Sequence, residues 1–191
     1  MAQQVRPKDA ERVIDLMISR GFQADAITYN NVIKAYAVGG EVEAQPKEAE
    51  RVMLQMEANG IMPDTVTFSI LLKSYANAQP VCSDDAQRVL MRMEERGLAP
   101  DTITYNTVFK AYGKSTIPYF FESMKLFEQM QAKNVHHDIY TYNSLLSVGK
   151  RDPRPGVMEA AMELYQIIPI GMRDQACMSH VARCVVAFVA C

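Results

Sequence analysis

The sequence has no tryptophan and little glycine or proline, with nine of each in 191 residues. This scarcity excludes a collagen-like or low-complexity chain. Thirteen methionines and few glycines favour helices over a β-sandwich or barrel. Hydrophobic residues make up 49% and charged residues 22%, a mixture typical of a folded protein rather than a disordered tail. We therefore expect a folded, helical chain.

Long apolar runs and a strong net charge are also missing. No segment reaches the ~18 consecutive apolar residues that a membrane span needs, and Arg183 interrupts the longest candidate, residues 181–191. Residues 1–12 lack the apolar core of a secretory signal and contain two acids, unlike a transit peptide. The net charge of −2 and a pI near 5.9 exclude a uniformly basic surface, although a local basic groove is compatible with both.

Signs of catalysis or metal binding are absent from the sequence. The four cysteines form no CxxC pair, which favours core thiols or a reducing compartment. Cys177, His180 and Cys184 share one helix face, but the two cysteines lie ~10 Å apart, too far to share a zinc ion with ~2.3 Å bonds. Walker, HExxH, GxSxG and deaminase motifs do not occur. We expect no cofactor, no metal and no enzymatic activity.

An internal repeat organises the chain. One phrase, Asp-x-x-Thr followed by an aromatic residue and Asn or Ser, recurs at residues 25–30, 64–69, 101–106 and 138–143. Successive phrases start 39, 37 and 37 residues apart, and Asp174 follows 36 residues later. Such regularity indicates an array of similar units.

Each unit is predicted to contain two helices. The first begins after the Asp, a good N-cap residue, and its apolar positions have helical spacing, as in Tyr29, Val32, Ile33 and Tyr36. The second is equally periodic, as in Ala49, Val52, Met53 and Met56. The second helices end at Gly60, Gly97 or Asn134, residues that tolerate a left-handed conformation at a helix C-terminus.

The units predict a solenoid, because one hairpin cannot bury its apolar face alone and stacked hairpins bury a continuous core with a concave side. The array is cut at both ends, so we expect flanking sequence or protein partners to cover them. The predicted division is a partial repeat with the second helix only (1–25), repeats 26–64, 65–101 and 102–138, a degenerate repeat 139–174, and a partial repeat with the first helix only (175–191).

A stripe of aliphatic, small polar and basic residues recurs on the first helices at positions i, i+3 and i+7. Its members are Ile27, Asn30 and Lys34; Val66, Ser69 and Lys73; Ile103, Asn106 and Lys110; Tyr140, Asn143 and Ser147; and Ala176, Ser179 and Arg183. A merely solvated face would vary more widely. One basic residue per repeat can neutralise successive phosphates, and the polar and aliphatic residues suit a base edge and a base face. Single-stranded RNA offers all three groups.

The phrases Thr-Tyr-Asn and Lys-Ala-Tyr, with the Met-x-x-x-Gly-x-x-Pro-Asp endings at Asp64 and Asp101, resemble the pentatricopeptide repeat family over residues 9–174. Tetratricopeptide repeats, an alternative of similar shape, carry a Trp-containing pattern that this chain lacks. The resemblance implies an all-α fold, a right-handed α-solenoid of helix-turn-helix repeats. It also implies single-stranded RNA binding, with one nucleotide per repeat, in RNA processing within an organelle, a mitochondrion or chloroplast.

The family's base-reading residues can be carried over to matching positions. The pairs Asn30 with Asp64, Ser69 with Asp101, Asn106 with Asp138, and Asn143 with Asp174 imply the preference U-G-U-U, read 5′ to 3′. The base-sandwiching residues would be Ile27, Val66, Ile103 and Tyr140, and the phosphate-binding residues Lys34, Lys73, Lys110 and Arg183. The recurring Asp has two interpretations, helix capping alone or capping combined with ligand binding.

Two features depart from the family pattern. The units are longer than usual, and residues 39–46 form the longest insertion between two helices; Ser147 replaces the basic residue in the fourth unit. Two other functions stay open. The repeats could be a protein scaffold in an organellar ribosome or another assembly, with a vestigial RNA groove, as the acidic pI and few repeats suggest. They could also be the RNA-binding part of an enzyme whose catalytic domain lies outside this chain.

Overall fold

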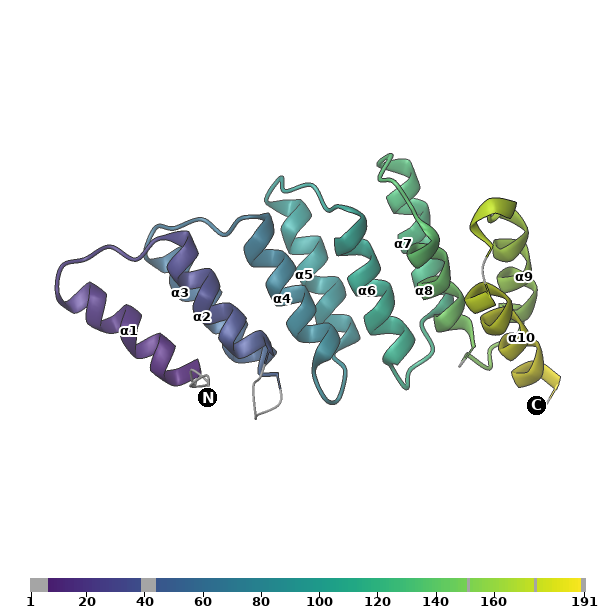
Figure 1. Cartoon of the computed structure of the whole chain (residues 1–191), viewed down its shortest axis with the longest axis horizontal. Coiled ribbons are helices and arrows are strands. Elements are labelled where there is room, and N and C mark those ends of the chain that lie inside the picture. The colour runs from purple at the N-terminus through teal and green to yellow at the C-terminus, as the bar shows by residue number, and fades with distance from the viewer. Residues whose placement is uncertain (1–6, 39–43, 151, 174, 190–191) are drawn as a thin grey trace. The chain divides into compact units, whose positions relative to one another are not determined.

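The protein was studied as a computed structural model, which describes residues 7–38, 44–150, 152–173 and 175–189 (Figure 1). Within these residues the regular structure is helical and no strand occurs. The helices are α1 (Pro7–Ser19), α2 (Ala26–Val38), α3 (Pro46–Ala58), α4 (Thr65–Asn77), α5 (Ser83–Glu95), α6 (Thr102–Lys114), α7 (Phe120–Ala132), α8 (Ile139–Gly149), α9 (Val157–Ile167), the short 3-10 helix η1 (Ile170–Met172) and α10 (Gln175–Val189). The expected all-α repeat array is confirmed.

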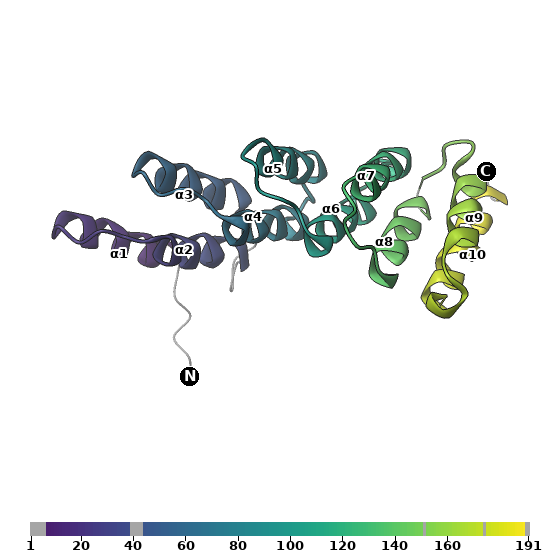
Figure 2. The same ribbon diagram turned by 90° about the horizontal axis from the view of Figure 1, so that it is seen from above.

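The chain divides into two compact units, Met1–Ala99 and Pro100–Cys191. In the first, α2 and α4 pack side by side in one layer, and α3 and α5 form the other layer (Figure 2). In the second unit, α8 contacts α6, α7, α9 and α10, and α9 and α10 also contact each other. The repeat boundaries given above stay predictions.

Capping by aspartate explains where the first helices begin. Oδ1 of Asp64 accepts a hydrogen bond from the backbone N–H of Thr67 at 2.8 Å, and the Asp64 N–H donates to the Thr67 hydroxyl at 3.2 Å. Thr141 repeats both contacts with Asp138. The same backbone bond at 2.8 Å starts α2 from Asp25 and α6 from Asp101. These contacts satisfy N–H groups that have no partner inside the helix.

The helix ends also follow from the sequence. Gly60 and Gly97 have φ values of 78° and 75°, and Asn134 has a φ of 54°. In this left-handed region the N–H of Ile61 reaches the carbonyl of Met56 at 3.1 Å and closes the last turn of α3. The predicted left-handed C-terminal residues are therefore confirmed.

The core consists of the apolar positions with helical spacing. Aromatic residues of the first helices, Tyr29, Phe68 and Tyr105, are fully buried. Val52 and Met53 of α3 are equally buried. At ~25 cal/mol per Å² of apolar area removed from water, these contacts are the main source of stability in each unit.

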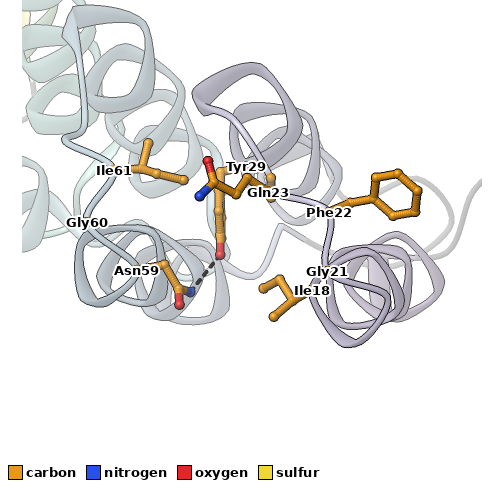
Figure 3. Close-up of a pocket in the computed structure, with 9 residues that line it drawn as sticks. Ile18, Gly21, Phe22, Gln23, Tyr29, Asn59, Gly60 and Ile61 are labelled. Carbon is orange, nitrogen blue, oxygen red and sulfur yellow. Dashed lines mark hydrogen bonds between the residues drawn. The ribbon is translucent and has the colours of Figure 1, made fainter.

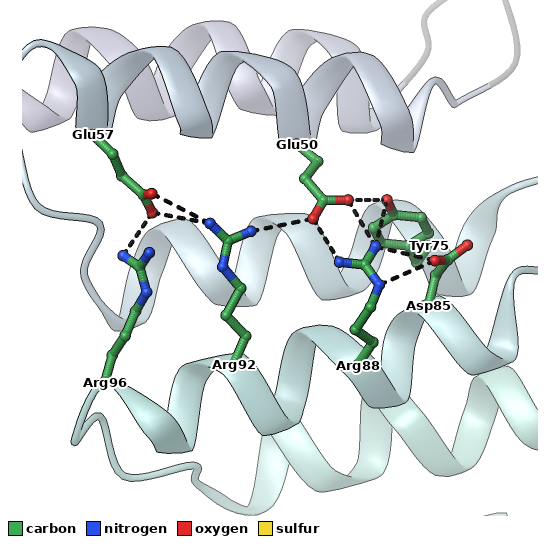
Figure 4. A network of polar contacts seen from close by, with 7 residues as sticks. All are labelled: Glu50, Glu57, Tyr75, Asp85, Arg88, Arg92 and Arg96. Atoms are coloured by element: carbon green, nitrogen blue, oxygen red, sulfur yellow. Dashed lines mark hydrogen bonds and ion pairs between the residues drawn. The ribbon is translucent and has the colours of Figure 1, made fainter.

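A network of carboxylates, tyrosine and arginines also holds the repeats of the first unit together (Figure 4). Glu50 of α3 accepts hydrogen bonds from Tyr75 of α4 and from Arg88 of α5, the latter at 2.8 Å. Arg92 of α5 pairs with two carboxylates of α3. Its Nη1 lies 3.3 Å from Glu50 Oε1, and its Nη2 lies 3.2 Å from Glu57 Oε2. One carboxylate thus ties its own helix to both helices of the following hairpin.

The same device occurs one step earlier along the chain. Glu11 of α1 accepts from the Tyr36 hydroxyl of α2 at 2.7 Å and from Arg51 of α3 at 2.7 Å. Glu11 and Glu50 occupy equivalent positions in their helices, as do Arg51 and Arg88. The contact is therefore a repeated feature that fixes the spacing of neighbouring hairpins.

The network lowers the pKa of Glu50. The hydrogen bond from Arg88 is the main cause, and contacts with Tyr75 and Arg92 add to it against the opposing effect of burial. A carboxylate with a lowered pKa in the folded state stabilises the fold above its unfolded pKa, and this contribution is lost as the pH falls through the folded value.

We expect Glu50→Gln to lower the free energy of unfolding at pH 7 by about 1–3 kcal/mol, because it leaves the arginines without their carboxylate. Stability of the parent chain should fall as the pH drops below about 4.3, the usual Glu pKa, and should fall less in the variant. Urea unfolding between pH 7 and pH 3.5 measures both effects.

Glu48→Gln is the matched control. The Glu48 side chain is 47% exposed and bonds Arg51 within the same helix, whereas the Glu50 side chain is 13% exposed. An exposed pair of this kind contributes about 0.5 kcal/mol or less. Equal stability and equal pH dependence in the two variants would contradict a structural role for the network.

Candidate nucleic-acid interface

The predicted base-sandwiching residues are apolar side chains exposed to solvent. The exposed fractions are 70% for Ile27, 55% for Val66, 62% for Ile103 and 72% for Tyr140. All four stand in the first turn of a first helix, two residues after the capping Asp. Single exposed apolar residues are ordinary, but recurrence at one position of each hairpin indicates a surface that contacts something.

The first predicted base-reading pair, Asn30 with Asp64, lies together in the first unit. Asn30 is buried between α2 and α4, and its Oδ1 accepts from the Thr67 hydroxyl at 2.8 Å. That hydroxyl also lies 2.8 Å from Asp64 Oδ1. Burial raises the pKa of Asp64, but bonds from the Thr67 N–H, the Thr67 hydroxyl and the Asn30 side chain outweigh it, so the pKa is lowered. The Asp64 carboxylate is therefore held in its charged form.

The third pair, Asn106 with Asp138, has a related geometry in the second unit. The Asn106 amide Nδ2 donates to Asp138 Oδ1 at 3.3 Å. Burial raises the pKa of Asp138, and bonds from Thr141 and Asn106 outweigh it and lower the pKa. Among the described residues, nothing donates to the buried Oδ1 of Asn106. This site differs from the first in holding an acceptor that is free to receive a donor.

For the other two pairs, the structure describes each residue separately or only one of the two. Ser69 donates its hydroxyl to the Thr65 carbonyl of its own helix at 2.8 Å. Its predicted partner Asp101 belongs to the second unit, where it caps α6. Asn143 is half-buried in α8, and Asp174 lies outside the described residues. Both pairings stay predictions.

The predicted phosphate-binding lysines are exposed. Lys34 and Lys73 stand at equivalent positions on the neighbouring helices α2 and α4, and Lys110 stands at that position on α6. The helix α10 contains Arg183, whose side chain lies outside the described part of the structure. Within the first unit, Lys34 and Lys73 thus lie on adjacent helices, one turn after Asn30 and Ser69.

Two features of this surface were missed in the sequence analysis. Burial and the nearby charge of Lys110 lower the pKa of Lys114, so these two cations act on the same region. Their spacing of four residues on one helix was the available signal. The second feature is the threonine in Asp-x-x-Thr, whose hydroxyl contacts the capping carboxylate and, at Thr67, also the predicted base-reading residue Asn30.

A pocket of about 530 Å³ opens between the C-terminal turns of α1 and α3 (Figure 3). Asn59 and Ile18 lie on either side of Tyr29, whose hydroxyl accepts from Asn59 Nδ2 at 2.8 Å. None of the predicted base-reading residues lines this pocket.

One step along the chain, a larger side chain stands where the pocket has Asn59. Arg96 lies over the Phe68 ring at 5.8 Å and pairs with Glu57 at 2.6 Å. Arg96 and Glu57 are the positional equivalents of Asn59 and Ile18. Asn59 is shorter than Arg96, and Ile18 has no charge to pair with it, so no ion pair fills the space here. The pocket is therefore open.

Other kinds of site are not evident in the described residues. They contain no cluster of three or more His, Cys, Asp or Glu side chains able to hold a metal ion. No helix among them combines the length and apolar character needed to cross a membrane. Cys177 is fully buried in α10 and does not form a disulfide.

Comparison with protein families identifies the chain. The family model for the pentatricopeptide repeat domain matches residues 12–78, 82–115 and 125–155. These ranges cover more than half of the sequence, so the chain belongs to the pentatricopeptide repeat family. Comparison with curated proteins gives no significant match.

Several solved structures share the fold. The maize protein PPR10, crystallised with an 18-nt psaJ RNA element, is 21% identical with a TM-score of 0.63; the match covers 97% of this chain and 26% of PPR10. The proteinaceous RNase P 2 (PRORP2) of A. thaliana is 13% identical with a TM-score of 0.72, covering 93% of this chain and 38% of PRORP2.

A third structure, the PPR domain of the A. thaliana protein-only RNase P 1 (PRORP1) in complex with tRNA, is 14% identical with a TM-score of 0.67. That match covers 94% of this chain and 90% of the PRORP1 domain. At these identities the likeness shows the fold. The chain spans about a quarter of PPR10 and less than two fifths of PRORP2.

The capping hydrogen bond and the negative charge of the recurring Asp can be separated at Asp64. We expect Asp64→Ala to lower the free energy of unfolding by about 1 kcal/mol, and Asp64→Asn to change it by less than about 0.5 kcal/mol, because Asn is an equally good N-cap. Asp15→Ala, at an exposed position within α1, is the control and should stay within about 0.5 kcal/mol. Urea unfolding measures all three. A large loss in Asp64→Asn would show that the charge itself holds the local fold.

Proposed function

We propose that this chain binds single-stranded RNA sequence-selectively, with one nucleotide per repeat and the preference U-G-U-U. The observation that carries the proposal is the recurring Asn–Asp pair beside an exposed aliphatic residue, with known geometry at Asn30–Asp64 and Asn106–Asp138. That the PPR10 and PRORP1 structures contain RNA supports the ligand class.

The chemistry of the Asn–Asp pair suits uracil. Uracil presents one N–H donor between two carbonyl acceptors, and an asparagine amide carries both an acceptor and donors. At the third repeat, Asn106 Oδ1 has no donor among the described residues, and Asp138 fixes the amide through Nδ2. A base N–H can supply that donor after a small rotation of the side chain. A buried acceptor left without a partner costs about 1–3 kcal/mol, which favours binding of a base that donates there.

The rest of the stripe supplies affinity. Stacking or apolar contact on Ile27, Val66, Ile103 and Tyr140 would cover the base faces, and such contacts are worth ~1–3 kcal/mol per base. Lys34, Lys73 and Lys110, with Arg183 at the predicted fifth position, would neutralise phosphates. Four repeats of this kind bind RNA usefully, although four bases do not define a unique transcript.

We further propose that the chain acts in RNA processing inside an organelle, a mitochondrion or chloroplast, and that it is not itself catalytic. Family membership supports this role, because pentatricopeptide repeat proteins are typically organellar. A protein scaffold in an organellar assembly is the second candidate function, and the acidic pI near 5.9 supports it.

The phosphate role can be tested by salt titration. With three lysine contacts, log K for a U-G-U-U oligonucleotide should fall with log salt at a slope of about −2, at ~0.7 per contact. Lys73→Gln should reduce that slope by about 0.7 and weaken all RNA sequences alike. Lys47→Gln, an exposed lysine on α3, is the control and should bind as the parent does. Fluorescence anisotropy over a salt series gives both numbers, and a flat salt response argues against phosphate contacts.

Base choice can be tested by changing one reading residue. Asn106→Ser gives the third repeat the Ser–Asp pair predicted to read G, so the preferred base at the third position should move from U towards G by about 1 kcal/mol or more. The control Asn31→Ser alters an exposed residue next to Asn30 that is not in the stripe, and its preference should match the parent's. Competition among oligonucleotides that differ only at the third base measures the change. An unaltered preference in Asn106→Ser would mean that this position does not read the base.

A further inference from the structure

The hydrogen bond between Thr67 and Asn30 joins two first helices of the first unit. Thr67 lies in α4 and Asn30 in α2, and these two helices pack on each other. Thr67 is fully buried and Asn30 is 9% exposed, so the 2.8 Å contact between the Thr67 hydroxyl and Asn30 Oδ1 is shielded from water. Removing one partner of such a bond leaves a buried polar atom unpaired, which is costly.

Helix capping alone does not account for this contact. The bond that caps α4 runs from the backbone N–H of Thr67 to Asp64 Oδ1 at 2.8 Å, and any residue except proline can donate it. The Thr67 hydroxyl adds to the cap by accepting from the Asp64 N–H at 3.2 Å, which uses an oxygen lone pair and not the hydroxyl proton. That proton has two acceptors at 2.8 Å, Asp64 Oδ1 and Asn30 Oδ1. When it points to Asn30, Asp64 Oδ1 keeps the Thr67 N–H as a donor.

Two neighbours determine which way the Asn30 amide faces. The Asn30 side chain also donates a hydrogen bond to the Asp64 carboxylate, and an amide donates only through Nδ2. With Nδ2 on Asp64 and Oδ1 on the Thr67 hydroxyl, each end of the amide has a partner of the matching kind. A half-turn of the amide would place Oδ1 against a carboxylate, which only accepts. Each end keeps one further site for a ligand, a lone pair on Oδ1 and an N–H on Nδ2.

The direction of the amide decides which pyrimidine it fits. Uracil presents an N–H donor beside a carbonyl acceptor, whereas cytosine presents an acceptor nitrogen beside an amino donor. We consider a base held in one place between the predicted sandwiching residues Ile27 and Val66. For that base, the described Asn30 amide matches uracil, and the same amide turned by half a turn would match cytosine.

We propose that Thr67 is a positioning residue of the first base-reading site: its hydroxyl fixes the direction of the Asn30 amide and so makes this site prefer uracil over cytosine. The proposal rests on the proposed function, because it adds a third member to the Asn30–Asp64 pair. Asp64 and Thr67 both belong to the start of α4, whereas Asn30 lies on α2. Two neighbouring first helices therefore build one reading site.

The third pair has the same capping motif without this bond. Thr141 repeats the backbone contacts with Asp138, and its hydroxyl lies 3.0 Å from Asp138 Oδ1. Among the described residues no group donates to Asn106 Oδ1, and Asp138 holds the amide through Nδ2. The bond from hydroxyl to amide is therefore not a necessary consequence of the cap. It is an additional contact that the first site has.

The test compares binding of the oligonucleotides U-G-U-U and C-G-U-U to the full 191-residue chain by fluorescence anisotropy. Thr67→Val removes the hydroxyl from a side chain of similar size. The preference for U over C at the first base should fall about fivefold, the effect of losing one hydrogen bond of typical strength. Thr67→Ala also lacks the hydroxyl and should show the same loss. Thr67→Ser keeps the hydroxyl and should retain the preference within about twofold of the parent.

Thr28→Val is the matched control. Thr28 stands on α2, two residues before Asn30, and its hydroxyl contacts the capping residue Asp25 at 2.6 Å. The variant loses a hydroxyl from the same motif, on the helix that carries Asn30, but the described contact to Asn30 Oδ1 comes from Thr67 and is kept. Its preference for U over C should equal that of the parent. Circular dichroism should show equal helicity in all five proteins.

The outcomes separate this role from the proposed function. A parent chain without a preference for U at the first base contradicts the proposed function, and the role of Thr67 falls with it. A parent that prefers U, with Thr67→Val and Thr67→Ala that prefer it equally, overturns the role of Thr67 alone. Loss of the preference in Thr67→Ser or in Thr28→Val also overturns that role, because the effect would then come from a loosened helix start.

Discussion

The structure depends on one constraint: a two-helix hairpin of this size cannot bury its apolar face without a neighbour. Tyr29, Phe68 and Tyr105 are fully buried, and within the first unit α2 packs on α3 and on α4 of the following hairpin. Stability in each unit is therefore shared among nearest neighbours, as in other repeat proteins. One face of each first helix lies outside these contacts. The aliphatic and basic residues of the stripe are on that face, where they are exposed to solvent.

The polar contacts refine this arrangement. Glu50 and Glu11 each join a second helix to both helices of the following hairpin, so the distance between hairpins is set by side chains of defined length. A carboxylate shared by a tyrosine and an arginine from two different helices tolerates little sliding of one helix past another. Even spacing of hairpins matters for a ligand whose own repeat is a nucleotide, because each reading position must meet the next base.

Much of the fold follows from the sequence, because the helix starts and ends have local causes. Asp64 and Gly60 determine a boundary through contacts within a few residues, and the helical period identifies the buried positions. The network around Glu50 was not predicted, since its members come from three helices and each residue alone is an ordinary surface residue. At the candidate interface, the aliphatic, polar and basic positions could be predicted from the sequence, because they recur at fixed places in each repeat. The bond from Thr67 to Asn30 was not, because it joins residues 37 positions apart in the chain.

Because of that bond, Asn30 of the first repeat and Asn106 of the third repeat differ in their hydrogen bonds before any ligand binds. Asn30 Oδ1 already has a protein donor in Thr67, whereas Asn106 Oδ1 has none among the described residues. Under the proposed function, a base that engages Asn30 through this oxygen would share it with the threonine hydroxyl, which already occupies one of its two lone pairs. At Asn106 the incoming base adds a bond where none existed. Under the proposed function, two repeats with the same predicted reading residues would therefore meet a base from different hydrogen-bonded states and contribute unequally to affinity.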